Sequence, residues 1–184
     1  MRLGDDSIQI IPFESCHGAL FYKWHLSGKY KQFFGNLEII PLEKWNQLKN
    51  AYMIVDANDI NTVYGCYVLR DIDQQNKNIS LHMMIDDSVQ KKGIGKKSVP
   101  FFLFYVFNQL NFYKIIARTS EDNKGVMNLF SKMGFKYEGL LKKHVLCDGE
   151  RIDLHQYALM KPQFNREIGD KLKKSASERV VSAA

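Results

Sequence analysis

The chain has 184 residues, of which 45% are apolar and 25% charged, and it carries a formal net charge of +6 at pH 7. This length suffices for one domain with a proper core, and the composition is that of a soluble globular protein, which excludes a largely disordered chain. The positive charge indicates an anionic ligand or partner and leaves two candidates, nucleic acid and a phosphorylated cofactor.

Apolar periodicity and turn residues predict elements in the order β-α-α-β-β-β-α-β-α-β-β. The predicted strands cover residues 7–13, 51–57, 62–73, 79–85, 113–119, 135–147 and 151–160. The predicted helices cover residues 18–34, 41–50, the stretch from a glycine-rich loop to residue 110, and 123–133. Gly134 suits the left-handed position just past a helix end, and Asp148-Gly149 predicts a hairpin. The order indicates an α/β domain with a single sheet at residues 1–164, followed by a polar tail at 165–184 that is partly helical at most.

Several kinds of site and location are not expected. The three cysteines, Cys16, Cys66 and Cys147, are scattered without a CxxC spacing, so we predict neither a metal site nor disulfides and place the protein in the reducing cytoplasm. The N-terminal residues lack the apolar run of a signal peptide. The longest apolar stretch, residues 99–107, is too short to cross a bilayer, so no membrane partner is expected.

The segment VQKKGIGKKS, residues 89–98, places two glycines between two pairs of lysines, after a predicted strand and before a predicted helix. Free N–H groups at a helix start attract anions, and glycine lets the backbone approach a phosphate closely. The segment therefore favours a pyrophosphate site, with a solvated lysine-rich turn as the alternative. The dinucleotide pattern needs a third glycine where Ser98 stands, and the Walker pattern needs glycine where Gln90 stands, so both patterns fail.

A third pattern does fit, because QKKGIG at residues 90–95 matches Q/R-x-x-G-x-G/A, the acyl-CoA loop of the GNAT superfamily of N-acetyltransferases. Further along, NKGVMNLFSKMGF resembles the second signature of that superfamily, an Asn that opens a short helix ending in Gly-Phe. The closing hairpin looks like that of the ribosomal-protein N-acetyltransferase branch, with matching residues at Glu138, Gly139, Gly149, Asp153 and Tyr157. The resemblance covers residues 7–162 and implies the acyl-CoA N-acyltransferase fold, a single mixed and mostly antiparallel sheet flanked by helices.

The resemblance implies acetyl-CoA as co-substrate and an acetyl transfer to an amine without a covalent enzyme intermediate. The strand before the loop is expected to separate from its neighbour and to bare backbone N–H groups near Met84 and Ile85, which polarise the thioester carbonyl. Asn123 is expected to contact the pantetheine arm, to cap the helix that it opens, or to do both. The main chain of the loop is expected to bind the pantetheine and pyrophosphate through Gln90, Lys91, Lys92, Gly93, Ile94, Gly95 and Lys96.

The general base is less well defined by the sequence. The superfamily often has Glu on the fourth strand, where this chain has Ser80. His82, two residues on and on the same face, is one candidate base, with a packed core histidine as the alternative. Glu121 is a second candidate, with a solvated carboxylate beside a helix start as the alternative, and Asp86 is a weaker third.

The general acid is also open, since Phe130 stands where many members of the superfamily have Tyr. Phenylalanine cannot donate a proton, so thiolate departure needs water, another hydroxyl such as that of Ser131, or no acid. A free thiol has a pKa of roughly 8.5, so unassisted departure is not prohibitive.

Pro100 falls inside the helix that the loop opens, which predicts an irregular first turn or a kink. That helix is apolar on every side, so it is expected to be covered twice, either within a thick core or by the second copy of a homodimer.

The acceptor amine is not defined by one motif. Candidate pocket residues, each with a core or surface position as the alternative, are Trp24, Tyr30, Phe33, Phe34, His144 and His155. Without a dense acidic cluster for a polycation, we favour a peptide N-terminus and keep an amino-sugar nucleotide as the second candidate. A non-catalytic acyl-CoA binding module is the rival of another class. A nucleic-acid partner ranks last, because the lysines do not line an aromatic face.

Overall fold

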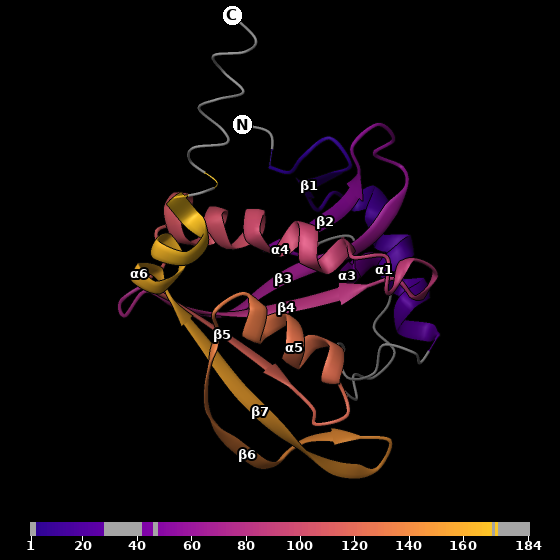
Figure 1. Ribbon diagram of the computed structural model, residues 1–184. Helices are drawn as coiled ribbons and strands as arrows, with labels where there is room; N and C mark the ends of the chain where they lie inside the picture. The colour runs from indigo at the N-terminus through magenta and orange to yellow at the C-terminus, as the bar shows by residue number, and fades with distance from the viewer. Residues whose placement is uncertain (1–2, 28–41, 46–47, 171, 173–184) are drawn as a thin grey trace, which may run out of the picture.

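The computed structural model describes residues 3–27, 42–45, 48–170 and 172, and these residues form one seven-stranded sheet flanked by helices (Figure 1). The strand order is β1-β2-β3-β4-β5-β7-β6, and the pair β4–β5 is parallel while the other neighbours are antiparallel. The strands are β1 (Ile8–Pro12), β2 (Ala51–Asp56), β3 (Val63–Asp73), β4 (Asn78–Ile85), β5 (Lys114–Thr119), β6 (Lys136–Cys147) and β7 (Glu150–Met160). The expected fold, a single mixed and mostly antiparallel sheet, is confirmed.

The helices cover both faces of the sheet. The α-helices are α1 (Gly18–Leu26), α3 (Leu42–Trp45), α4 (Ile94–Phe104), α5 (Lys124–Lys132) and α6 (Lys161–Phe164). Short 3₁₀ and π segments are η1 (Ser15–His17), η2 (Asp87–Val89), η3 (Tyr105–Gln109) and η4 (Asn165–Gly169). Among the described parts of the chain, no helix is both long and apolar enough to span a membrane.

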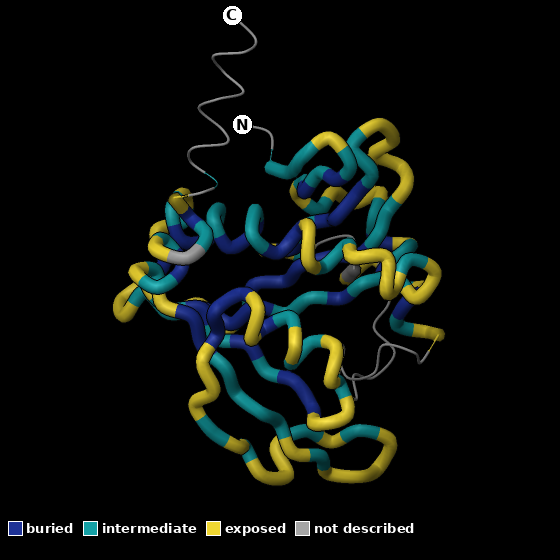
Figure 2. Tube along the Cα trace, viewed as in Figure 1, coloured by how far each residue is buried: buried dark blue, intermediate teal, exposed yellow. Residues whose placement is uncertain are grey.

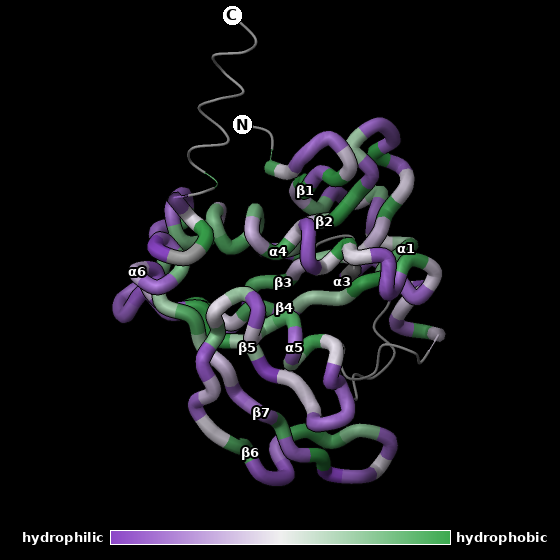
Figure 3. Tube along the Cα trace, in the orientation of Figure 1, coloured by the Kyte–Doolittle hydropathy of each residue, from purple (hydrophilic) through white to green (hydrophobic). Residues whose placement is uncertain are grey.

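The core lies in two layers separated by the sheet. The larger cluster joins α4, α5 and α6 to one face and includes Phe102, Leu103, Phe107 and Phe164, all fully buried. The smaller cluster packs Phe21 and Trp24 of α1 against the opposite face. Figure 2 shows buried residues along the central strands and on part of α4, whereas the outer end of the β6–β7 hairpin is largely exposed; Figure 3 shows many hydrophilic residues in that hairpin.

Helix α4 accommodates Pro100 in its interior and continues as the π segment η3. The π register appears in the bond from the N–H of Leu110 to the carbonyl of Tyr105, at 3.1 Å. Phe101, Phe104 and Tyr105 on the outer sides of this helix pack against the larger cluster within the same chain. Of the two expected covers for this helix, a thick core within the chain or a second copy of the protein, this packing corresponds to the first.

Two turns have the predicted geometry. Gly134 follows α5 with φ of +83°, the left-handed position expected after the helix end. Asp148 and Gly149 join β6 to β7 with φ of +52° and +83°, as a tight hairpin turn requires.

Other predicted boundaries differ from the structure. Helix α1 ends at Leu26, and residues 28–34 of the expected first helix lie outside the described residues. The expected helix 41–50 is described only as α3, and residues 48–50 are not helical. Beyond residue 164 the chain continues in a helical course, and Ile168 and Leu172 pack against the larger cluster, so the beginning of the predicted tail contributes to the core.

Candidate functional site

The strands β4 and β5 separate after a short paired segment, as Figure 1 shows. Their parallel pairing covers Asn78↔Lys114, Ile79↔Ile115 and Ser80↔Ile116, and extends no further within the described residues. We call the region between the two strands beyond the Ser80–Ile116 pair the fork. Along the fork, the inner edge of β4 has no strand partner in the described part of the chain, so backbone groups on that edge are available to a ligand.

The direction of backbone groups along β4 follows from the bonds at its two ends. The N–H of Asp86 donates to Tyr64 of β3 at 2.9 Å, and the N–H of Lys114 donates to the Lys77 carbonyl at 3.1 Å. Because successive residues of a strand direct these groups to alternate edges, even-numbered residues face β3 and odd-numbered residues face the fork. Of the two residues predicted to polarise a carbonyl, Ile85 therefore faces the fork and Met84 faces β3.

The glycine-rich loop forms the start of α4. Gly93 is the N-cap residue with φ of +81° and ψ of 7°, a left-handed conformation that glycine adopts without strain. The first helical hydrogen bond runs from the N–H of Lys97 to the Gly93 carbonyl at 3.0 Å. The N–H groups of Ile94, Gly95 and Lys96 precede that bond and have no helical carbonyl to bond, so they are available to an anion at the start of the helix.

The loop lies directly beside the fork. A Cβ on Gly95 would lie 3.3 Å from Cδ2 of Leu129 in α5 and 3.6 Å from Cε of Met83 in β4. The side chain of Gln90 donates to the carbonyl of Ile85 at 3.3 Å and to Asp87 at 2.8 Å. These contacts fix the loop against the end of β4, so a ligand bound at the α4 amides can extend into the fork.

The charge around the loop is positive and solvent-facing. Lys91, Lys92, Lys96 and Lys97 are all exposed. Lys97 donates to the hydroxyl of Ser7 at 3.3 Å, and Lys91 has φ of +62°. A pyrophosphate fits this set of donors, because the amides supply hydrogen bonds and the ammonium groups supply charge.

Asn123 caps α5. Its side-chain oxygen accepts a hydrogen bond from the N–H of Val126 at 3.2 Å. The cap predicted from the sequence is therefore present, and the side-chain NH₂ group stays available for a ligand contact.

His82 lies on β4, on the face of the sheet that α1 covers. The pKa of its imidazole is lowered from the usual 6.5 to about 4, chiefly by burial; the charges of Arg70 and Arg118 contribute to the lowering and that of Asp71 opposes it. The ring is consequently neutral at neutral pH, when a ring nitrogen can accept a proton but is only weakly basic.

The other two candidate bases have structural partners. Glu121 is exposed and forms an ion pair with Lys124 at 3.6 Å across the first turn of α5. Asp86 accepts hydrogen bonds from the N–H and hydroxyl of Ser88 and from the indole of Trp24, the last at 2.7 Å. Burial would raise the pKa of Asp86, but these hydrogen bonds outweigh it and leave the pKa lowered.

Phe130 is buried in the larger cluster, 5.1 Å from the ring of Phe135 and 5.5 Å from the ring of Tyr157. The side chain of Phe130 therefore packs between α5 and the sheet, as part of the larger cluster.

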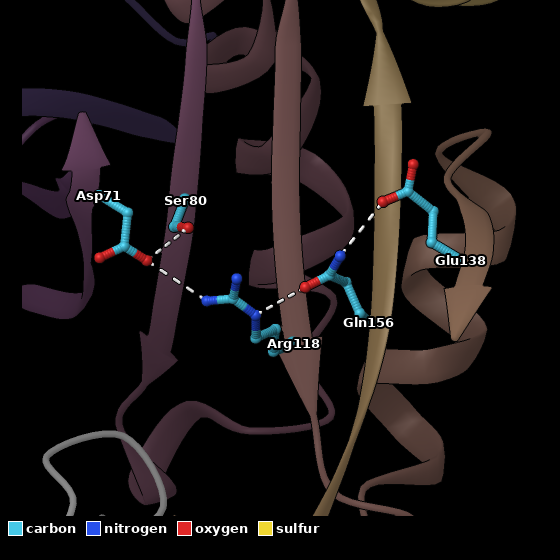
Figure 4. A network of polar contacts seen from close by, with 5 residues as sticks. All are labelled: Asp71, Ser80, Arg118, Glu138 and Gln156. Atoms are coloured by element: carbon cyan, nitrogen blue, oxygen red, sulfur yellow. Dashed lines mark hydrogen bonds and ion pairs between the residues drawn. The ribbon is translucent and has the colours of Figure 1, made fainter. Parts of the chain in front are cut away.

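A polar network crosses the sheet on the face opposite α4 and α5 (Figure 4). Ser80 donates to Oδ2 of Asp71 at 2.8 Å, and Arg118 donates from Nη1 to the same oxygen at 3.3 Å. The Nε of Arg118 donates to Gln156 at 2.9 Å, and Gln156 donates to Glu138 at 3.2 Å. The network begins at the closed end of the fork, because Ser80 is the last β4 residue that pairs with β5.

Asp71, Arg118 and Gln156 belong to no motif that marks them as site residues in the sequence. Strand pairing brings them together from β3, β5 and β7, and a single sequence does not reveal that pairing. A signal beside them was Ser80, which the sequence analysis singled out for its position on the fourth strand.

The structure does not bring together the described residues that were predicted to line the acceptor pocket. Trp24 is buried under the sheet, His144 is exposed on β6, and the ring of His155 lies 5.7 Å from that of Tyr137. Tyr30, Phe33 and Phe34 lie outside the described residues. No group of three His, Cys, Asp or Glu side chains in the described parts of the chain is arranged to hold a metal ion.

Comparison with known proteins agrees with this geometry. Residues 19–136 match the family model of the acetyltransferase (GNAT) domain. The "uncharacterized N-acetyltransferase p20" of Bacillus licheniformis is 25% identical over 115 residues, which are 62% of this chain and 64% of that protein. A spermidine N(1)-acetyltransferase of Escherichia coli (strain K12) is 22% identical over 136 residues, 69% of this chain and 73% of that protein.

Two solved structures have the same fold at 16% identity. Spermidine N-acetyltransferase from Vibrio cholerae, in complex with CoA and spermine, superposes with a TM-score of 0.79 over 87% of this chain and 99% of that chain. Ribosomal-protein-S5-alanine acetyltransferase from Vibrio fischeri gives a TM-score of 0.75 over 89% of this chain and 98% of that chain. At this identity the likeness concerns the fold alone.

The family match spans more than half of the chain and includes the fork, the glycine-rich loop and the Asn123 cap. It favours an enzyme over a non-catalytic binding module and over a nucleic-acid binder. The chain therefore belongs to the GNAT acetyltransferases, acyltransferase enzymes that act on amines and use acetyl-CoA as co-substrate.

Proposed function

We propose that the protein acetylates the N-terminal amine of a peptide or protein by direct attack while both substrates are bound, and that it does so in the cytoplasm. The observation that carries this proposal is the juxtaposition of the fork with the free N–H groups of Ile94, Gly95 and Lys96. The cytoplasmic location is supported by the three cysteines, all of which are free thiols.

Acetyl-CoA supplies the activated acetyl group. The residues that would hold it are the main chain from Gln90 to Lys96, with Asn123 at the other side of the fork. The fork-facing N–H of Ile85 would bond the carbonyl that is attacked, and Met84 would keep β4 in place through its pairing with Cys66.

His82 is our first choice for the group that accepts the amine proton. Its imidazole is neutral at pH 7 and lies on β4 beyond the closed end of the fork. Glu121 is the second choice, because its exposed carboxylate needs only to rotate away from Lys124.

The acceptor preference follows from charge. Arg70, Arg118 and Lys114 contribute three positive charges on or near the polar network, against two negative charges from Asp71 and Glu138. A surface with excess positive charge does not attract a polycation such as a polyamine. A peptide N-terminus does not require a negatively charged pocket, and neither does the second candidate, an amino-sugar nucleotide.

The test is an acetyl-CoA turnover screen with peptides of varied N-terminal residue, amino-sugar nucleotides and polyamines. The proposal expects kcat/KM to be highest for a peptide. Higher kcat/KM for a polyamine would refute the preference, and the absence of turnover with every amine would refute the proposed reaction.

A further inference from the structure

We propose that Arg70 and Arg118 form a binding site for an anionic group on the acceptor, so that the acceptor is an amine that also carries a carboxylate or phosphate. This inference rests on the proposed function and specifies its substrate class. The two arginines would act as specificity-determining residues on the face opposite the CoA loop.

The sheet register places both arginines around the same point. Arg70 on β3 pairs with Ser80 on β4, and Ser80 pairs with Ile116 on β5. Arg118 follows Ile116 by two residues, so its side chain is on the same face as that of Ile116, one step into the fork. His82 follows Ser80 by two residues and therefore lies between the two arginines.

The guanidinium groups have unused donors. Arg70 is half-buried and has no hydrogen-bond or ion-pair partner among the described residues. Arg118 uses Nε for Gln156 and Nη1 for Asp71, and its Nη2 bonds no group in the described ranges. A guanidinium donates up to five hydrogen bonds and suits carboxylate or phosphate oxygens, so these donors are complementary to such an anion.

The neighbouring groups hold Arg118 in place but bond only part of its hydrogen-bond donors. Gln156 fixes Nε at 2.9 Å and is itself fixed by Glu138. Asp71 contacts Nη1 with one oxygen at 3.3 Å, and its side chain is 65% exposed, whereas that of Arg118 is 26% exposed. Solvent screens such a pair, so an incoming anion can share Arg118 with Asp71.

The electrostatic surroundings of His82 agree with this placement of the two arginines. Both arginines lower the pKa of His82. Their positive charges therefore act on the imidazole together, and their combined effect on its pKa exceeds the opposite effect of Asp71. Among the described residues, the charged groups that act on His82 include Arg70 and Asp71 from β3 and Arg118 from β5. A positive potential beside the candidate base favours an acceptor anion at that place and favours the neutral form of the reacting amine.

The experiment compares acceptors that differ in one anionic group. The pairs are the tetrapeptide amides Ser-Asp-Gly-Gly and Ser-Asn-Gly-Gly, and glucosamine 6-phosphate against glucosamine. The wild-type protein should show a KM at least tenfold lower for the anionic member of one pair, and the pair that shows it identifies carboxylate or phosphate as the source. Equal KM values within both pairs would overturn the inference.

The variants Arg70→Met and Arg118→Met should each raise KM for the anionic acceptor at least tenfold and leave KM for its neutral counterpart within twofold. Arg151→Met, at the distant end of the hairpin, is the matched control and should change neither. Arg70→Lys keeps the charge and should recover part of the loss, and it replaces Arg70→Met if that variant does not fold. A KM increase of equal size for both members of a pair would show a structural role only and would contradict the inference.

A binding measurement separates this inference from the proposed reaction. In the wild-type protein with CoA bound, adding the Asp peptide should raise the pKa of His82 measured by NMR, because a bound carboxylate offsets the arginine charges, and the Asn peptide should not. No difference between the peptides in a protein that does acetylate amines refutes only the anion site. Absence of turnover with all amines refutes the proposed function and the present inference with it.

Discussion

Arg118 on β5 donates to Asp71 on β3, although β4 lies between their strands. The contact is made possible by a bulge in β3 between Arg70 and Asp73, where Asp71 has φ of +47° and its carboxylate reaches over β4 to Ser80. The carboxylate thereby ties β3, β4 and β5 together at the closed end of the fork. A left-handed non-glycine residue held by two hydrogen bonds is a feature found at functional sites.

Replacement of Gly93 by Val should weaken acetyl-CoA binding at least tenfold while the domain stays folded. No atom lies within 4 Å of a Cβ at this position, so the cost of about 1–2 kcal/mol comes from the left-handed φ of +81° rather than from a clash. The backbone should relax and turn the amides of α4 away from the phosphates. Calorimetric titration with acetyl-CoA measures the change.

Gly149→Val is the matched control, because Gly149 has a similar φ of +83°, equally open surroundings and a position at the hairpin tip. It should lower the free energy of unfolding by a similar amount without affecting acetyl-CoA affinity. Equal affinities for the two variants would contradict a phosphate site at the start of α4.

Gly65→Ala should distort the end of β4. A Cβ at this position would overlap the carbonyl oxygen of Met84 and lie 3.0 Å from Cα of Ile85, both of which are backbone atoms that cannot rotate away. We expect a loss of about 1–3 kcal/mol in the free energy of unfolding and weaker acetyl-CoA binding. Gly139→Ala on β6, with no atom within 4 Å of its Cβ, should change neither quantity appreciably in urea denaturation and calorimetry.

Substitutions of Asn123 distinguish its two predicted roles. Asn123→Ala removes the cap of α5 and should cost about 1 kcal/mol of unfolding free energy. Asn123→Asp keeps the accepting oxygen, so stability should be retained, but it removes the NH₂ donor. If Asn123 contacts the pantetheine arm, Asn123→Asp should weaken acetyl-CoA binding; retained affinity would leave the cap as its only role.

His82 should make stability pH-dependent between its two pKa values. In the unfolded chain the imidazole protonates near 6.5, whereas in the folded protein it protonates near 4. Between these values the unfolded state binds the extra proton, so the free energy of unfolding falls as the pH falls through this window and levels off below it. The difference of roughly 2.5 pKa units corresponds to about 3 kcal/mol as an upper value. Urea denaturation from pH 4 to 7 should show a shallower dependence for His82→Gln than for the wild-type protein.

The same residue affects the rate if it accepts the amine proton. His82→Ala should then reduce kcat at least tenfold at pH 7, with acetyl-CoA affinity unchanged. Because the imidazole titrates near 4, the wild-type rate between pH 6 and 9 should follow the ionisation of the acceptor amine and not that of His82. An unchanged rate in a folded His82→Ala protein would transfer the role to Glu121, which the corresponding Gln variant tests.

The sequence by itself determined the order of the elements, the sheet class and the position of the glycine-rich loop at the start of α4. These features depend on local chemistry: alternation of apolar residues, Gly-Phe after α5, Asp-Gly in the hairpin, and glycine where α4 begins with φ of +81°. Such signals lie within ten or so residues of each other, so they can be read without knowing which strands are neighbours.

The tertiary structure alone decided which polar side chains meet. Asp71, Ser80, Arg118, Gln156 and Glu138 come from five different strands, and their order across the sheet does not follow their order in the chain. The low pKa of His82 is likewise set by burial and by arginines 12 and 36 residues away in sequence (82 − 70 and 118 − 82). Long-range strand pairing and burial are properties of the assembled sheet, so no local pattern in the sequence encodes them.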